Sequence, residues 1–252
     1  MDILLSTATH RSGSTLLQRI FNARMKTLIW GENGGCLSSF CNIYHDALYY
    51  ADHSKQERAK YFNSGEDPNH WIATMTPPKD IVTASIIHSV KSFHEVLYEK
   101  KYKDTHDLIG YKEVRYGNAE LNLFRMCYPK ATIILLVRNP VDVWKSVSQN
   151  AKVNRYRSVK SFSNLWNRRV KTYIDLSNAH ANIHLIRYED LIDKNQATLD
   201  LIKRIGKITD EQIEKVLSVK ISSSGRPIAK AHEHQIRKSC LNLLNKMGYH
   251  HG

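Results

Sequence analysis

A short segment near the N-terminus combines residue types that bind anionic groups. Residues 10–15 read His-Arg-Ser-Gly-Ser-Thr, and they separate an apolar run from a stretch in which Leu and Ile recur at helical spacing. A loop of this kind ahead of a helix offers free backbone N–H groups and hydroxyl donors, which favour a bound phosphate. The Walker pattern GxxxxGK[ST] is absent, so no lysine of this loop reaches a γ-phosphate. The same Ser/Gly turn also serves as an ordinary helix cap, and on this segment alone both interpretations stay open.

A second pair of anion-binding side chains follows a later apolar run. Arg138 comes directly after residues 131–137, and Asn139 and Pro140 suit the cap and first position of a following helix. Ser146 then lies about two turns from the cap on the same helical face, so it can converge with Arg138 on one anion. The alternative is that Arg138 pairs only with a surface carboxylate.

The elements that position these residues alternate between strand and helix. Short apolar runs predict strands at residues 2–9, 27–30, 107–114, 131–137 and 182–186. The alternation predicts right-handed crossovers and an α/β, P-loop-type three-layer fold with a central parallel β-sheet flanked by helices. Ligands of such sheets bind at the carboxyl ends of the strands, so the residue after each strand is a candidate for the site.

Three of these strand exits resemble motifs of the sulfotransferases that use 3′-phosphoadenosine 5′-phosphosulfate (PAPS). Residues 11–16, Arg-Ser-Gly-Ser-Thr-Leu, resemble the family's 5′-phosphosulfate loop, closest to the RSG[ST]T variants of its tyrosylprotein and carbohydrate branches. Arg138 and Ser146 resemble its strand–Arg–x7–Ser motif, which holds the 3′-phosphate. Tyr188 stands in a Tyr-Glu-Asp segment that resembles one whose Tyr contacts adenosine. The resemblance covers most of the chain except residues 41–105.

The resemblance implies PAPS as cofactor and adenosine 3′,5′-bisphosphate as product. A late loop of the family closes over the nucleotide, and residues 224–226 occupy its place but depart from its RKG pattern. The cofactor-binding residues that the resemblance implies are Arg11, Ser12, Gly13, Ser14, Thr15, Leu16, Arg138, Ser146, Tyr188, Ser224, Gly225 and Arg226.

Sulfuryl transfer requires a cation at the bridging oxygen and a group that accepts the acceptor's proton. Arg11 stands at the place of the family's loop Lys or Arg, which implies that it stabilises the bridging oxygen, with Lys112 assisting. Glu32 is the first candidate base, because Trp30-Gly31-Glu32 resembles the Gly-Glu segment that provides the base in tyrosylprotein sulfotransferases. The alternative is a salt bridge from Glu32 that orients an arginine. His10 is a second candidate base.

Composition limits the partners and the compartment. Thirty-seven Lys and Arg against 24 Asp and Glu give a formal charge of +13, which favours an anionic partner. The four cysteines lack CxxC spacing, and neither a signal peptide nor a bilayer-length apolar run is visible, so we expect a cytoplasmic protein without a membrane partner. No metal-ligand constellation stands out among the 13 histidines, and we expect no metal.

We expect one sulfotransferase domain over residues 1–252, with a mostly helical insertion at about 41–105 that shapes the acceptor pocket. The acceptor is expected to be a hydroxyl or amine compound, in the simplest case a small molecule. Between residues 144 and 171 there are eight Lys or Arg and no Asp or Glu, including Arg155 and Arg157. This basic run is either a solvated helical face or a border of the acceptor cleft. The sequence does not indicate an oligomeric state.

Two other functions compete with sulfuryl transfer. A P-loop nucleotide kinase is disfavoured by the missing Walker lysine and by the Arg138–Ser146 pair, which suits a 3′-phosphate that ATP lacks. A non-catalytic polyanion-binding protein on the same scaffold would use the +13 charge. No RNP, zinc-finger or helix-turn-helix pattern is present, so we expect no nucleic-acid partner.

Overall fold

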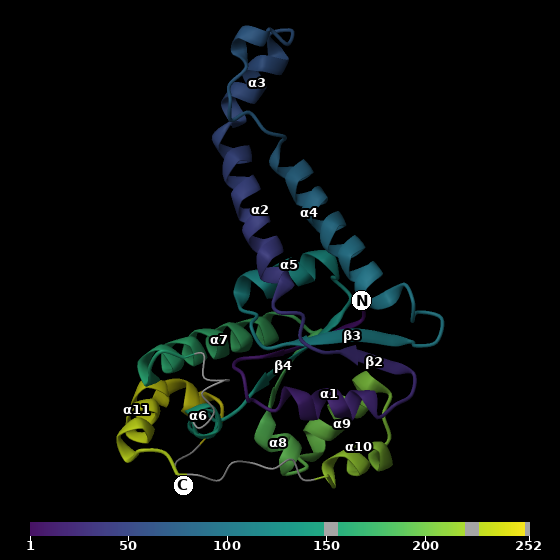
Figure 1. Ribbon diagram of the computed structural model, residues 1–252, viewed down its shortest axis with the longest axis vertical. Coiled ribbons are helices and arrows are strands. Elements are labelled where there is room, and N and C mark those ends of the chain that lie inside the picture. The colour runs from purple at the N-terminus through teal and green to yellow at the C-terminus, as the bar shows by residue number, and fades with distance from the viewer. Residues whose placement is uncertain (149–155, 220–226, 250–252) are drawn as a thin grey trace.

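Five parallel strands form the central sheet of the protein, whose structure is a computed structural model describing residues 1–148, 156–219 and 227–249 (Figure 1). The strands are β1 (Ile3–Thr7), β2 (Thr27–Trp30), β3 (Leu108–Glu113), β4 (Thr132–Val137) and β5 (Ile183–Arg187). Their order in the sheet is β2-β3-β1-β4-β5, and every adjacent pair is parallel. The predicted α/β fold class with a central parallel sheet flanked by helices is therefore confirmed.

Helices cover both faces of this sheet. The helices of the described residues are α1 (Ser14–Asn22), α2 (Cys36–His53), α3 (Lys55–Asn63), α4 (Lys79–His94), α5 (Asn118–Cys127), α6 (Pro140–Ser148), α7 (Val159–Ala179), α8 (Tyr188–Ile192), α9 (Gln196–Gly206), α10 (Asp210–Leu217) and α11 (Lys230–Lys246). A short 3₁₀ turn, η1 (Pro68–His70), and a π-helical turn, η2 (Glu95–Glu99), complete them. No helix within these described ranges is both long and apolar enough to cross a bilayer.

The alternation of side chains along the buried strands creates two apolar cores. Along β1, Leu4 packs into the core shared with α5, α7 and α11, whereas Ile3 and Leu5 pack into the core shared with α1, α9 and α10. Successive strand residues point to opposite faces, so a strand buried on both sides has no solvent-exposed face. All five residues of β1 are buried; the first three are apolar, and the hydroxyls of Ser6 and Thr7 bond to the Tyr173 hydroxyl and to the backbone oxygen of Thr9.

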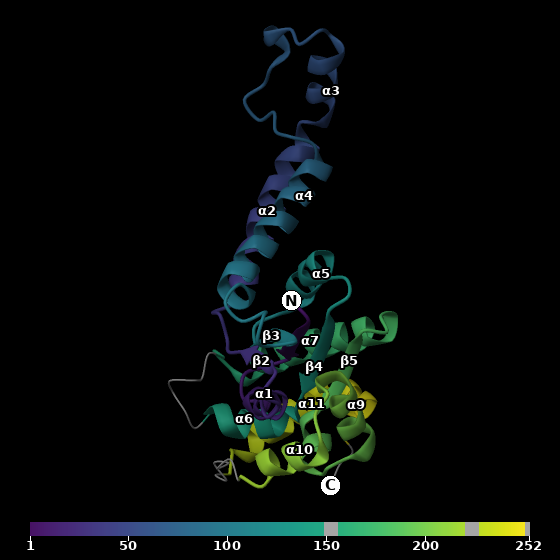
Figure 2. The same cartoon turned by 90° about the vertical axis from the view of Figure 1, so that its right-hand side faces the viewer.

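A helical arm, residues 36–99, separates β2 from β3. Its helices α2 and α4 pack against each other and extend away from the sheet, with α3 at the far end (Figures 1 and 2). Within this arm, α4 is followed directly by the π-helical turn η2.

The crossovers bring strand exits that are far apart in sequence to one edge of the sheet. Trp30 at the end of β2 pairs in register with Tyr111 of β3, and Leu5 of β1 pairs with Lys112. On the other side, Val137 at the end of β4 pairs with Arg187 at the end of β5. The residues that follow these positions are the ones in which the sequence predicts the site.

Candidate active site

The loop between β1 and α1 has the backbone geometry of an anion cradle. Gly13 caps α1 in the left-handed conformation with φ 89°, and Arg11 has φ 64°. Ser12 is buried, and its hydroxyl bonds with the backbone carbonyl and the hydroxyl of Thr9. Ser14 is buried at the start of α1, whereas Thr15 is exposed. A loop with left-handed residues ahead of a helix turns its N–H groups toward a common point, which suits a phosphate.

Gly13 is required for close approach as well as for its backbone angle. A Cβ on Gly13 would lie 2.1 Å from Cδ2 of Tyr188, far closer than any real contact. Tyr188, the first residue of α8, therefore packs directly over the loop. The guanidinium carbon of Arg138 lies 4.4 Å from the centre of the Tyr188 ring, which is a cation–π contact.

Arg11, Arg138 and Ser146 come together from three elements. Arg138 donates from Nη1 to the backbone oxygen of Arg11 at 3.1 Å, and Arg11 donates from Nε to Ser146 Oγ at 2.9 Å. The sequence predicts Arg11 at the bridging oxygen, but the structure directs its side chain to the residue pair predicted for the 3′-phosphate. Neither arginine has a carboxylate within salt-bridge distance in the part of the chain that the structure describes.

A buried donor at this position still lacks a partner. The Nε atom of Arg138 is buried and makes no hydrogen bond with any described residue. Its backbone oxygen is held by the indole N–H of Trp166 at 3.1 Å, which fixes the residue at the strand exit. An unpaired buried guanidinium N–H is costly unless a ligand accepts from it, so the residues present fit an anionic group such as the 3′-phosphate of the implied nucleotide.

A second cluster, formed by Glu32, Lys112, Arg115 and Glu113, lies at the exits of β2 and β3. Lys112 is buried, and its ammonium donates to Glu32 Oε1 at 2.6 Å and to Ser14 Oγ at 3.4 Å. Arg115 donates to the other oxygen of Glu32 at 3.1 Å. Lys112 therefore links the predicted base to the first residue of α1, and the predicted salt bridge of Glu32 with an arginine is also present.

The charges around Glu32 set its protonation state. Burial alone would raise the pKa of Glu32, but the hydrogen bond and charge of Lys112, with the charges of Arg115 and His10, outweigh it and lower the pKa below the ordinary value of 4.5. The carboxylate is therefore ionised at neutral pH, as a proton acceptor must be. His10 lies near enough for its charge to act on Glu32, and it is half-buried.

Glu113 holds this second cluster together, and the sequence analysis did not select it. The side chain is fully buried; Oε2 accepts from the backbone N–H of Gly35 at 2.8 Å, and Oε1 accepts from that of Val114 and from Arg115. Gly34 and Gly35 both have positive φ, so Glu113 fixes the turn that follows Glu32. Its signal in the sequence was its place directly after Lys112, near the end of the strand predicted at residues 107–114.

Arg169 of α7 is a second residue that the sequence did not single out. Its guanidinium donates to the backbone oxygens of Ala8 at 2.9 Å, of Val114 at 3.0 Å and of Arg115. It thereby joins the exits of β1 and β3 from the helix layer. No local pattern distinguishes it from the other cations of the basic run, because its partners are backbone oxygens distant in sequence.

Some sequence predictions lie outside these two clusters. Ser224, Gly225 and Arg226 fall outside the described residues, as does Arg155. Arg157 is exposed and lines a cavity of about 370 Å³ with Trp144, Lys160 and His232. Within the described ranges, no group of three or more His, Cys, Asp or Glu side chains could hold a metal ion.

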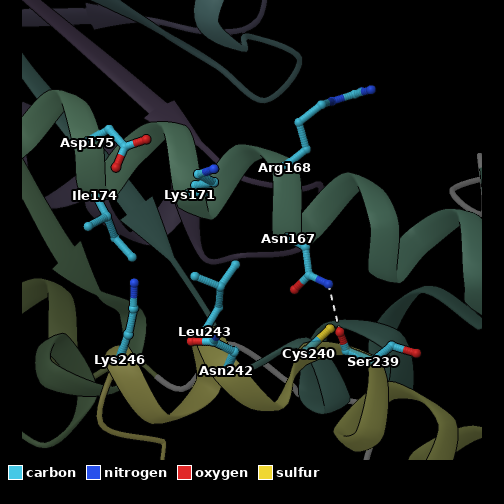
Figure 3. A pocket seen from close by; sticks show the side chains of 10 residues that line it. All are labelled: Asn167, Arg168, Lys171, Ile174, Asp175, Ser239, Cys240, Asn242, Leu243 and Lys246. Atoms are coloured by element: carbon cyan, nitrogen blue, oxygen red, sulfur yellow. Dashed lines mark hydrogen bonds between the residues drawn. The ribbon is translucent and has the colours of Figure 1, made fainter.

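A cavity of about 460 Å³ lies between α7 and α11 rather than at the strand exits (Figure 3). Asn167 donates to the backbone oxygen of Ser239 across it at 2.8 Å, and the aliphatic side chains of Ile174 and Leu243 face each other there. None of the site residues predicted from the sequence lines this cavity. The candidate site is defined by its convergent polar groups.

Comparisons with known proteins identify the family and the fold. The model of a family described as the sulfotransferase family matches residues 6–209. Among solved structures, the sulfotransferase domain of the olefin synthase from Synechococcus PCC 7002 superposes with a TM-score of 0.57 at 17% identity, covering 100% of this chain and 96% of that one. The sulfotransferase domain from the curacin biosynthetic pathway gives 0.58 at 14% identity, covering 100% and 99%. No curated protein matches the sequence.

Proposed function

The chain belongs to the sulfotransferase family, and we propose that it transfers the sulfuryl group of PAPS to a hydroxyl or amine of an acceptor. The observation that carries the choice of donor is the Arg138 guanidinium, which has a buried N–H without a partner among the described residues and donates to the backbone oxygen of Arg11 in the loop ahead of α1. A nucleotide with phosphates at both the 3′ and 5′ positions would occupy both features, whereas ATP would leave the first unused.

In this proposal the loop of residues 12–15 and the two arginines bind the nucleotide, and the cluster around Glu32 takes part in the transfer reaction. Backbone N–H groups of residues 12–15 hold the 5′-phosphate side, and Arg138, Ser146 and Arg11 hold the 3′-phosphate. Tyr188 covers the loop and limits where the adenosine can lie. These contacts orient the donor without taking part in bond changes, so they lower the cost of bringing the two reactants into line.

Bound PAPS supplies the sulfuryl group, whose bond to the 5′-phosphate oxygen breaks as the acceptor atom bonds to sulfur. Glu32 takes the proton that the acceptor hydroxyl or amine loses, so its hydrogen bond with Lys112 must open or be shared at that moment. Lys112 stabilises the negative charge that develops on the departing phosphate oxygen, since its ammonium already reaches Ser14 at the start of α1. His10 is the alternative base.

The acceptor would approach from the side of Glu32. The turn of residues 33–35 leads directly from Glu32 into α2, so we propose that the base of the insertion at about 41–105 shapes the acceptor pocket of a single domain. A small cytoplasmic hydroxyl or amine compound is the proposed acceptor class.

Calorimetric titration of adenosine 3′,5′-bisphosphate tests the nucleotide site without requiring the acceptor. Wild type should bind the bisphosphate and bind adenosine 5′-monophosphate much more weakly. Arg138→Ala should weaken bisphosphate binding by roughly 10- to 100-fold, the effect of losing charge-assisted hydrogen bonds. The matched control is Arg19→Ala, which removes the same charge from an exposed position on α1 and should leave binding unchanged.

Folded wild-type protein that binds no bisphosphate would overturn the PAPS assignment. Turnover of ATP with magnesium would then indicate a kinase, and salt-dependent binding of polyanions would indicate a non-catalytic role.

A further inference from the structure

The peptide group between Arg138 and Asn139 is held from both sides. Its carbonyl oxygen accepts from the indole N–H of Trp166 on α7 at 3.1 Å, and its N–H donates to Oε1 of Glu189 on α8 at 2.9 Å. The Trp166 side chain is fully buried. Because both polar groups of one planar peptide are bonded to different helices, the peptide and the Cα atom of Arg138 are fixed in place.

A second contact fixes Glu189 itself. Its other oxygen, Oε2, accepts from the hydroxyl of Tyr249 at 2.8 Å. The turn after α11 that leads to Tyr249 is also held, because Arg187 donates to the backbone oxygens of Met247 at 3.2 Å and Gly248 at 3.3 Å. Burial and the charge of Glu189 raise the pKa of Tyr249 above its ordinary value of 10.0, so the hydroxyl keeps the proton that it donates. The carboxylate is therefore held at both oxygens.

Glu189 lies next to the predicted nucleotide site. Tyr188, its neighbour in the chain, packs over Gly13, and the guanidinium of Arg138 lies over the Tyr188 ring. Both oxygens of Glu189 accept from neutral donors, so the carboxylate leaves the charge of Arg138 for a ligand. A carboxylate next to an anion site repels the ligand, so its presence there requires a compensating role. The hydrogen bond to the peptide after Arg138 supplies one.

We propose that Glu189 is a positioning residue for the 3′-phosphate of the nucleotide and that Tyr249 holds its carboxylate in place. The inference rests on the proposed function, because it concerns how Arg138 meets that phosphate. Arg138 donates from Nη1 to the backbone oxygen of Arg11, and its buried Nε, which has no partner among the described residues, is left for the ligand. A shift of the peptide after Arg138 would move this guanidinium away from the 3′-phosphate and leave the loop of residues 12–15 unchanged.

Discrimination between two ligands separates positioning from a general loss of structure. Glu189→Ala should raise the dissociation constant of adenosine 3′,5′-bisphosphate about tenfold in calorimetric titration, whereas that of adenosine 5′-monophosphate should change less than about twofold. A merely structural residue would weaken the binding of both ligands together. Glu189→Gln should restore bisphosphate affinity to within about threefold of wild type, since its amide keeps an acceptor for Asn139 and a donor for the Tyr249 hydroxyl.

Tyr249→Phe is a milder test that keeps the Glu189 side chain. Loss of the hydroxyl should raise the bisphosphate dissociation constant roughly two- to fivefold and leave that of the monophosphate unchanged. The matched control is Tyr44→Phe, which removes a hydroxyl that bonds to Thr83 at 3.0 Å in the arm and should alter neither constant. If Glu189→Ala does not fold, Tyr249→Phe decides, and an unchanged preference for the bisphosphate overturns the inference. In an Arg138→Ala background, Glu189→Ala should have almost no further effect, because its action passes through Arg138.

Hydrogen exchange tests the contact without a nucleotide. The Asn139 amide should exchange at least about tenfold faster in unliganded Glu189→Ala than in wild type, and Glu189→Gln should restore its protection. Unchanged protection overturns the inference whether or not a nucleotide binds. If wild type binds the bisphosphate and Glu189→Ala keeps the same preference between the two ligands, the inference fails and the proposed function stands. If wild type binds no bisphosphate, the proposed function fails, and the role of Glu189 at the 3′-phosphate fails with it.

Discussion

Two pairs of cations lie at the carboxyl edge of the sheet, and they differ in whether their charge is compensated. Arg11 and Arg138 bond to a hydroxyl and a backbone oxygen, and no carboxylate within the described residues pairs with them. Lys112 and Arg115 are bound to carboxylates of the same cluster. The first pair is therefore available to an anionic ligand, whereas the second pair sets the protonation and position of a carboxylate.

This difference predicts which kinetic quantity each side controls. Substitutions in the uncompensated pair should alter nucleotide affinity, because that pair gains its counter-charge only from the ligand. Substitutions in the compensated cluster should alter the rate at saturation, because its groups act on the transferred proton and on the developing charge. Turnover is measured with PAPS and an acceptor found by screening hydroxyl and amine compounds.

Glu32→Gln should have the largest effect. It removes the proton acceptor but keeps the side-chain shape, so kcat should fall on the order of 10³-fold, within the range for general bases. Affinity for the bisphosphate, measured by calorimetry, should change by less than a factor of about three. A variant with nearly wild-type kcat would assign the base to His10 instead, which His10→Gln would then reveal.

Lys112→Met should lower kcat by roughly 10²-fold, because one preorganised donor to the departing oxygen is lost. It should also move the acid limb of the kcat profile. Burial raises the pKa of Glu32 and Lys112 is the strongest influence that lowers it, so removing Lys112 raises this pKa and shifts the limb to higher pH. If the acid limb of the kcat profile does not move in Lys112→Met, then Glu32 is not the group whose titration produces that limb.

Glu113→Gln should reduce kcat about tenfold while bisphosphate affinity stays unchanged. Gln can keep the hydrogen bond from Gly35, but Arg115 loses one of its two carboxylate partners and acts more strongly on Glu32. The pKa of Glu32 should fall further, so the acid limb moves to lower pH, opposite to the shift expected for Lys112→Met. A shift in the same direction for both variants would contradict a positioning role for Glu113.

Ser146→Ala should have the smallest effect and should appear only in binding. It removes the hydroxyl that accepts from Arg11 at the predicted 3′-phosphate site, so bisphosphate affinity should fall about two- to tenfold, the contribution of a single hydrogen bond. Binding of adenosine 5′-monophosphate and kcat at saturating PAPS should not change. A large loss of kcat in this variant would contradict the claim that the Arg11–Arg138 pair controls only nucleotide affinity.

The strands were predictable from sequence because each is a short apolar run with a clear boundary. The run at residues 27–30 coincides with β2, and the predicted strand ends locate the edge at which both cation pairs lie. The direction in which the Arg11 side chain points could not be predicted from sequence. It depends on the left-handed backbone of Arg11 and on a hydrogen bond to Ser146, 135 residues away. Glu113 was missed because a buried carboxylate shows its partners only after the Gly34–Gly35 turn has folded against it.

The direction of the arm was likewise hidden in the sequence. Helical spacing predicts that helices form in residues 41–105, but the side on which they leave the sheet depends on how the chain crosses from β2 to β3. The roles assigned to the site residues remain predictions for the variants above.

The position of β1 in the sheet has a consequence for how the protein folds during synthesis. β1 precedes both of its partner strands in the chain, yet it lies between them at the centre of the sheet, where Ile3 pairs with Gly110 on one side and Thr132 on the other. At roughly 5–20 residues per second, its partners emerge many seconds later. Until then β1 has no strand to pair with, so the nascent chain exposes its apolar residues Ile3, Leu4 and Leu5, which a chaperone would recognise.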